Sequence, residues 1–170
     1  MGTFQSLIIR GGFDAVYQPP AGVTGVNKTS RNTPFDYTLG SGTGASQCDL
    51  NYRAQRTLAA SANEDLDLAG VLADDFGSTL TFVKVRGIWI KAAAGNTNNV
   101  IIKPASSNGF TGPFGAATHT ITLPPDGSFQ VTAPVNGWTV TAGTGDKINI
   151  ANSAGSTTVT YDIHVIGASA

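Results

Sequence analysis

Charge is what this sequence has least of. Charged residues make up 12% of its 170 residues, against about a quarter in ordinary globular domains. Proteins that bind nucleic acid usually carry a cationic excess, because contacts with phosphates supply most of their non-specific affinity. Here 10 Lys and Arg face 11 Asp and Glu, so we expect no nucleic-acid partner. Such a surface is typical either of a subunit covered by its neighbours or of a β-protein whose surface is neutral and polar.

Cysteine and long apolar runs are also scarce. Cys48 is the one cysteine, which excludes an internal disulfide framework and leaves stability to the core or to an oligomer. The apolar stretch Leu7 to Ile9 is far too short for a signal-peptide core or a membrane span. The sequence therefore predicts a protein made in a cytoplasm without export and with no membrane partner.

Residues that perform catalysis or bind metals are few. The two histidines are His119 and His164, with Asp162 on the same strand face as His164. A hydrolase needs a nucleophile, a base and an orienting acid, and no Gly-x-Ser-x-Gly elbow supplies the nucleophile. Two distant histidines and Cys48 make a poor zinc set. We therefore predict no enzyme activity, no catalytic residue, no metal, no cofactor and no small-molecule substrate.

Two further patterns invite functional interpretations. Calcium needs six to eight converging oxygen ligands, and Glu64 to Asp67 with Asp74 and Asp75 provide no such loop, so solvated edge or interface residues are expected. The run Gly40 to Gly44 resembles a phosphate-binding loop, but no buried strand precedes it and no helix follows it. A flexible hinge is the preferred interpretation.

The segment 1–46 differs from the rest of the chain. Its glycines and prolines are too frequent for regular elements, yet its apolar side chains are too many for a disordered tail. An extended N-terminal arm that lies on another subunit fits both observations, and an arm that folds back on its own domain is the alternative. The predicted partner-binding residues are Phe4, Leu7, Ile8, Ile9, Phe13, Val16, Tyr17, Phe35 and Tyr37.

The segment 47–170 is predicted to be an all-β domain. Short alternating apolar and polar stretches are separated by turn signals, of which Pro124 to Gly127 is the clearest. About eight strands and no amphipathic helix favour an antiparallel β-sandwich, with a jelly roll suiting eight strands best. The expected strands are 56–60 with 63–68, 79–91 with a bulge near 84–87, 100–103, 119–123, 128–133, 137–142, 147–151 and 157–166.

Four aromatic residues are candidates for a binding platform. Trp89 and Trp138, with Phe110 and Phe114, are residue types on which sugar rings stack. Aromatic side chains also supply the largest buried areas of a core or an interface. Since both tryptophans lie within strand patterns, the core interpretation is preferred.

Several phrases of the sequence resemble small structural proteins of tailed-bacteriophage virions, those that decorate or cement capsids. The likeness covers roughly the last two-thirds of the chain. The phrases are Arg56 to Ser61, Glu64 to Gly70, Asp75 to Phe82, Gly95 to Asn99, Gly137 to Asp146 and Tyr161 to Ile163.

The resemblance implies a non-enzymatic β-domain on the outer capsid surface of a virion. Its expected partners are the major capsid protein and further copies of itself, in a homodimer or homotrimer whose arms reach neighbouring subunits. Such a protein would cement the head by bridging capsid subunits. A tail or fibre component and a glycan-binding or receptor-binding virion module are the alternatives.

Overall fold

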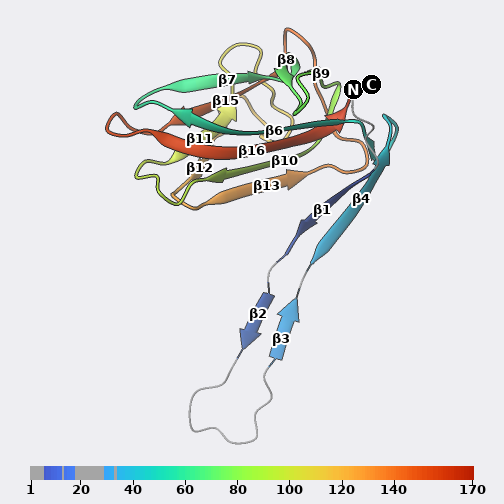
Figure 1. Ribbon diagram of the computed structural model, residues 1–170, viewed down its shortest axis with the longest axis horizontal. Helices are drawn as coiled ribbons and strands as arrows, with labels where there is room; N and C mark the ends of the chain where they lie inside the picture. Colours follow the sequence, from blue (N-terminus) through green and yellow to red (C-terminus); the bar gives the residue numbers. More distant parts are fainter. Residues whose placement is uncertain (1–5, 13, 18–28, 33) are drawn as a thin grey trace, which may run out of the picture.

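The computed structural model describes residues 6–12, 14–17, 29–32 and 34–170. All regular structure within these ranges is β-strand, and no helix is present there. The all-β prediction is confirmed. Figure 1 shows two parts, a sandwich and a narrow ribbon that projects from one end of it.

The sandwich consists of two sheets in which neighbouring strands are antiparallel. The first sheet has the order β13-β10-β16-β6, with β14 also paired to β10. Its strands are β6 (Leu50–Leu58), β10 (Lys84–Ala92), β13 (Ser128–Thr132), β14 (Trp138–Thr139) and β16 (Val159–Ala168). The second sheet has the order β12-β11-β15-β7. Its strands are β7 (Asn63–Asp67), β11 (Val100–Pro104), β12 (Ile121–Leu123) and β15 (Lys147–Asn152).

The core lies between the two sheets because their strands alternate apolar and polar side chains. On β16, Val159, Tyr161, Ile163 and Val165 are buried, whereas the residues between them are partly exposed. Burying one large apolar side chain contributes roughly 1.5–3 kcal/mol. Strands of period two therefore pack face to face and leave their polar side chains outside.

Apart from β11 and β12, which share a sheet, and β13 and β14, which share the other, consecutive strands of the sandwich alternate between the two sheets. In chain order, β6, β10, β13 and β16 belong to one sheet, and β7, β11, β12 and β15 belong to the other. The antiparallel β-sandwich expected from the sequence is thus present, with the short β14 added to about eight main strands. Its strand order is compatible with the expected jelly roll, in which two Greek keys alternate between two sheets.

The N-terminal ribbon is a pair of successive antiparallel ladders. In the first, β1 (Ser6–Gly11) pairs with β4 (Phe35–Ser41), and in the second β2 (Asp14–Tyr17) pairs with β3 (Thr29–Asn32). The short strand β5 (Gln47–Cys48) runs parallel to the end of β4. The backbone is extended as expected, but the prediction that this segment lacks regular elements is wrong, since its strands pair with each other.

A small hairpin stands beside the sandwich. It joins β8 (Ala69–Ala73) to β9 (Thr79–Thr81) through a turn at residues 74–77, where Asp74 Oδ1 accepts hydrogen bonds from the amides of Phe76 and Ser78 at 2.9 and 2.8 Å. The single strand expected at 79–91 is therefore two strands in different sheets. The bulge expected near 84–87 is confirmed, between Val85 and Gly87.

Two other strands are shorter than expected. Residues 119–120 and 137 lie outside regular structure, and β14 ends at Thr139 instead of continuing to residue 142. Residues 140–146 instead form a turn, in which the amide of Gly145 donates to Thr141 O at 2.8 Å and the amide of Gly143 donates to the Asp146 carboxylate. Local side-chain acceptors compete with a sheet ladder in this way.

Candidate interaction surface

The base of the ribbon is anchored by a small apolar cluster. Ile9 and Leu39 are 7% and 1% exposed and pack with Cys48 and Ile166, while Leu7 packs against this cluster. Ile166 belongs to the outer side of the first sheet, opposite the core. The ribbon therefore continues from the sandwich as a packed extension of it.

The pairing register determines which ribbon residues share a face. Directly opposite residues of an antiparallel pair lie on the same side, and Ile9 pairs with Tyr37, whereas Gly11 pairs with Phe35. Phe35 and Tyr37 are thus on the face that carries Ile9 and Leu39, but farther from the sandwich. They are 38% and 42% exposed, and their rings lie 5.7 Å apart at an interplanar angle of 41°.

Only the inner half of the ribbon's apolar face is therefore buried. Its inner end is buried on the sandwich, and its outer end presents two adjacent aromatic rings to solvent. Isolated exposed apolar residues are ordinary, but contiguous ones mark contact surfaces. We call Phe35 and Tyr37 the outer aromatic pair.

The opposite face of the ribbon is mixed. Ile8 is 49% exposed and pairs with Thr38. Arg10 and Asp36 lie directly opposite each other, with Arg10 Nε 3.4 Å from Asp36 Oδ1. An exposed ion pair of this kind contributes roughly 0–1 kcal/mol, so it guides register more than it stabilises the ribbon.

The predicted partner-binding residues thus have different positions. Ile8, Phe35 and Tyr37 are exposed, whereas Leu7 and Ile9 anchor the ribbon to its own sandwich, as the alternative of a folded-back arm anticipated. Val16 and Tyr17 belong to β2. Phe4 and Phe13 lie outside the described residues.

The glycine-rich segment is fixed by a buried arginine. Arg86 is 2% exposed, and its guanidinium donates to Val135 O at 2.5 Å and Gly44 O at 2.6 Å, with a longer contact to Thr43 O at 3.4 Å. The amide of Ser46 also donates to Val135 O at 3.0 Å. The prediction of a flexible hinge at Gly40 to Gly44 does not agree with these contacts. The loop ties the ribbon to the sandwich.

The thiol of Cys48 lies within the anchoring cluster and is fully buried. Burial raises its pKa to about 11, and the nearby charge of Arg86 opposes this only in part. Because the thiolate is the reactive form, Cys48 is an inert apolar residue here.

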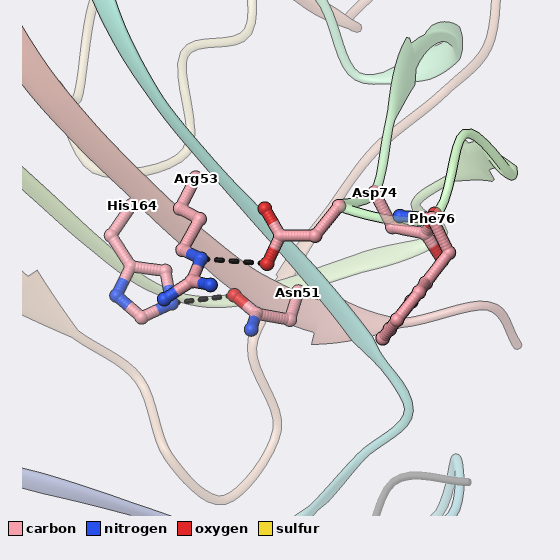
Figure 2. Close-up of polar contacts among 6 residues, drawn as sticks. Asn51, Arg53, Asp74, Phe76 and His164 are labelled. Atoms are coloured by element: carbon pink, nitrogen blue, oxygen red, sulfur yellow. Dashed lines mark hydrogen bonds and ion pairs between the residues drawn. The ribbon is translucent and has the colours of Figure 1, made fainter. Parts of the chain in front are cut away.

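Three exposed apolar positions outside the ribbon were not foreseen. Val71 and Phe76 on the β8–β9 hairpin are 72% and 79% exposed, and Val135 is 53% exposed. The turn chemistry of Asp74 holds Phe76 outward (Figure 2). The sequence signal was available, since an apolar residue inside an Asp-Asp-x-Gly turn has no strand face on which to bury.

The candidate aromatic platform does not assemble. Phe110 and Phe114 are buried in the main core, and Trp138 packs against it. Trp89 differs, since it is partly buried on the outer face of the first sheet. The core interpretation is wrong for Trp89, and the alternation of Ile88, Trp89 and Ile90 would have placed it outside, because both isoleucines are buried.

The residues weighed for catalysis have other partners. His164 Nε2 donates to Asn51 Oδ1 at 2.5 Å, and Asp162 Oδ1 accepts from Gln55 at 3.0 Å. His119 Nδ1 lies 2.6 Å from Phe114 O. Among the residues that the structure describes, no group of three or more His, Cys, Asp and Glu side chains is placed to hold a metal ion.

Glu64 has a structural role that the sequence did not indicate. It accepts a hydrogen bond from the Tyr161 hydroxyl at 2.7 Å and another from Arg56 Nε at 2.6 Å, so it links β7 to β16 and β6 across the two sheets. Burial, followed by this hydrogen bond, raises the pKa of Tyr161. The expectation of a purely solvated residue is wrong for Glu64, whose side chain is partly buried.

Stability is expected to fall as the pH drops below the pKa of an ordinary histidine. Burial, helped by the charge of Arg53, lowers the pKa of His164, although Asp75 opposes this shift. The unfolded chain therefore binds a proton near pH 6.5 that the folded chain resists, so the stabilisation is complete above about pH 6.5 and is lost below it. Urea unfolding at pH 7.5 and 5.5 should show a smaller acid loss for His164→Gln than for the natural chain. His119→Gln is the matched control, and an unchanged loss in His164→Gln would contradict the expectation.

Comparisons with known proteins identify no family for this chain. No protein-family model matches the chain, and no curated protein matches it. One solved structure that is similar comes from work described as "Bacillus endospore appendages form a novel family of disulfide-linked pili". It is 15% identical, covers 70% of this chain and 90% of that chain, and has a TM-score of 0.28. A likeness at this TM-score carries no argument. No helix capable of crossing a membrane occurs in the part of the chain that the structure describes.

Proposed function

We propose that this protein is a non-enzymatic structural protein of a tailed-phage virion, which binds the outer capsid surface and stabilises the head by bridging capsid subunits. The observation that carries the proposal is the anchored ribbon, whose apolar face continues past the sandwich to the outer aromatic pair. The phrases shared with capsid decoration proteins support the choice of a virion.

The base of the ribbon is firmly attached to the sandwich. A ribbon tied down by Arg86 and by the buried cluster loses little conformational freedom when it binds, so less of the contact energy is spent on ordering it. The outer aromatic pair supplies the kind of apolar contact that dominates binding energy at interfaces. The sandwich then acts as a rigid body that sets where the ribbon points (Figure 1).

Bridging would stabilise a head by mass action. A protein that binds the intact lattice but not separated subunits shifts the equilibrium toward the intact lattice. In a homodimer or homotrimer, several ribbons engage adjacent subunits at a high effective concentration. The major capsid protein and further copies of this chain are therefore the proposed partners, and neither nucleic acid nor a membrane is required.

Shortening the ribbon tests the proposal. Residues 12–34 are replaced by Asn-Gly, which closes the β1–β4 ladder with a two-residue turn, and the outer aromatic pair is replaced by serine, while Ile9, Leu39 and Arg86 stay in place. We expect the shortened protein to keep its melting temperature but to lose co-sedimentation with expanded capsids, and to leave those capsids more easily disrupted by heat. Co-sedimentation equal to that of the full chain would overturn the bridging role of the ribbon.

Location on the particle separates the head from the tail. Cryo-electron microscopy of virions should show many copies on the outer head lattice, each with its ribbon across a boundary between capsid subunits. Density confined to the tail or a fibre would overturn the cementing proposal and favour the alternative of a tail or fibre component.

A further inference from the structure

The outer face of the first sheet contains an aromatic residue among polar ones. Trp89 on β10 lies directly between Gln130 of β13 and His164 of β16, and Arg53 of β6 follows His164 in the same row. Trp89 is partly buried but does not belong to the main core. A large aromatic ring is thus left on a sheet face that is otherwise lined with hydrogen-bonding groups.

Two clefts meet at this tryptophan. The first, of about 240 Å³, separates the ribbon base from the sheet, and its lining includes Ile8, Arg10, Trp89 and His164. The second, of about 390 Å³, continues across the sheet on the other side. Its lining is Arg53, Ala54, Gln55, Asp75, Trp89, Asp162, Ile163 and His164. Since Trp89 and His164 line both clefts, the two lie next to each other on the sheet, and we call them together the groove.

Gly87 and the ribbon base shape one side of the first cleft. Gly87 is the neighbour of Trp89 on the same strand face, and a Cβ atom there would lie 3.1 Å from Ile166. The glycine makes room for the Ile166 side chain, and the ribbon supplies a wall on that side. Gln130 Nε2 donates to Arg10 O at 3.3 Å, which links wall and floor.

The polar groups of the groove are planar and paired with one another. Arg53 Nε donates to Asp75 Oδ2 at 2.7 Å, and His164 donates to Asn51 (Figure 2). Gln55 donates to Asp162. Each of these amide, imidazole, guanidinium and carboxylate groups retains further donor or acceptor positions. The lining holds two positive groups, Arg10 and Arg53, and two negative groups, Asp75 and Asp162, so the groove offers many hydrogen bonds and no net charge.

We propose that this groove binds a neutral oligosaccharide, with one pyranose ring stacked on the Trp89 indole. The ring's C–H groups form an apolar face that suits the indole, and its hydroxyls suit planar side chains that both donate and accept. Binding sites commonly combine an aromatic floor with a few placed polar groups. The paired charges favour an uncharged ligand over an acidic polysaccharide or a nucleic acid.

This inference does not depend on the cementing role. A capsid protein and a tail protein would both gain attachment to surface glycans from it. The ribbon contributes to the groove only through its base, whereas the outer aromatic pair lies farther from the sandwich. Substitutions in the groove and at the pair therefore report separately on the two proposals.

Fluorescence titration tests the groove directly. In the Trp138→Phe variant Trp89 is the sole indole, and maltohexaose, cellohexaose, laminarihexaose and mannohexaose are the probes. We expect a saturable change in emission with at least one probe, with a Kd of about 1 mM, as is reasonable for an open, shallow site. An absence of saturable change with all four neutral probes would overturn the proposal, as would binding of hexagalacturonate alone.

Variants then assign the binding to the groove. By isothermal titration, Trp89→Ala should weaken the active probe at least tenfold, and Gln130→Ala, which alters only an exposed side chain, should weaken it less. Phe76→Ser is the matched control on an exposed aromatic outside the groove lining. Equal affinity in Trp89→Ala and the natural chain would place the sugar elsewhere and overturn the proposal. Melting curves establish whether each variant is folded. If Trp89→Ala does not fold, the affinity of Gln130→Ala decides the test.

Discussion

Replacing Arg86 by alanine is expected to lower the free energy of unfolding by about 3 kcal/mol, because it removes two hydrogen bonds made by a charged group and the packing of a buried side chain. The guanidinium donates to Val135 O and Gly44 O at 2.5 and 2.6 Å from a side chain that is 2% exposed. A hydrogen bond to a charged group contributes about 1.5–3 kcal/mol. Two such bonds outweigh the relief of no longer burying the charged group.

The expected loss can be separated from a general effect of removing arginine. Arg53 forms an ion pair with Asp75 at 2.7 Å, but the Arg53 side chain is 66% exposed, so Arg53→Ala should cost less than about 1 kcal/mol. Urea unfolding followed by tryptophan fluorescence measures both variants. Similar losses in the two would contradict the role assigned to Arg86.

A second variant distinguishes hydrogen bonding from packing. Arg86→Met keeps much of the side-chain volume but provides no donor, so it should remain nearly as destabilised as Arg86→Ala. Proteinase K should also cleave both variants faster near residues 42–46, because the loop there loses its attachment to the sandwich. Recovery of natural stability in Arg86→Met would show that filling the space, and not binding the carbonyls, is what matters.

Replacing both residues of the outer aromatic pair by serine is expected to weaken lattice binding by at least about a hundredfold, because buried aromatic hot-spot residues each contribute about 2 kcal/mol or more. Phe35 and Tyr37 are exposed in the isolated chain, so the same double variant should change its own stability by no more than about 0.5 kcal/mol. Binding is measured by co-sedimentation with expanded capsids, and stability by urea unfolding.

The matched control for the aromatic pair is Val135→Ser. Val135 is an exposed apolar residue outside the ribbon, and its replacement should leave lattice binding unchanged. Undiminished binding by the double variant would contradict the proposed contact. A large loss of stability without loss of binding would instead show that the pair packs on its own sandwich.

The ribbon shows why part of the fold escaped sequence analysis. Gly11 and Gly12 are typical of a break, yet Gly11 is the last residue of β1. A Cβ atom at Gly11 would lie 2.4 Å from Cζ of Phe35, so the glycine makes room for the ring opposite it. In the sequence, a glycine that ends a strand and a glycine that makes room for a cross-strand neighbour look the same. The neighbour of Gly11 is Phe35, which lies 24 positions away in the chain.

The sequence by itself determined the β-sandwich, because a period of two along each strand and the turn residues between strands are local properties of the chain. It also indicated that the N-terminal segment is extended. Only the tertiary structure decided that Arg86 holds the glycine-rich loop, that Glu64 links the two sheets, and that Trp89 lies in an outer groove while Trp138 packs against the core. Each of these depends on a partner far away in the chain, and an alternating pattern specifies which side a residue faces but not which residue it meets there.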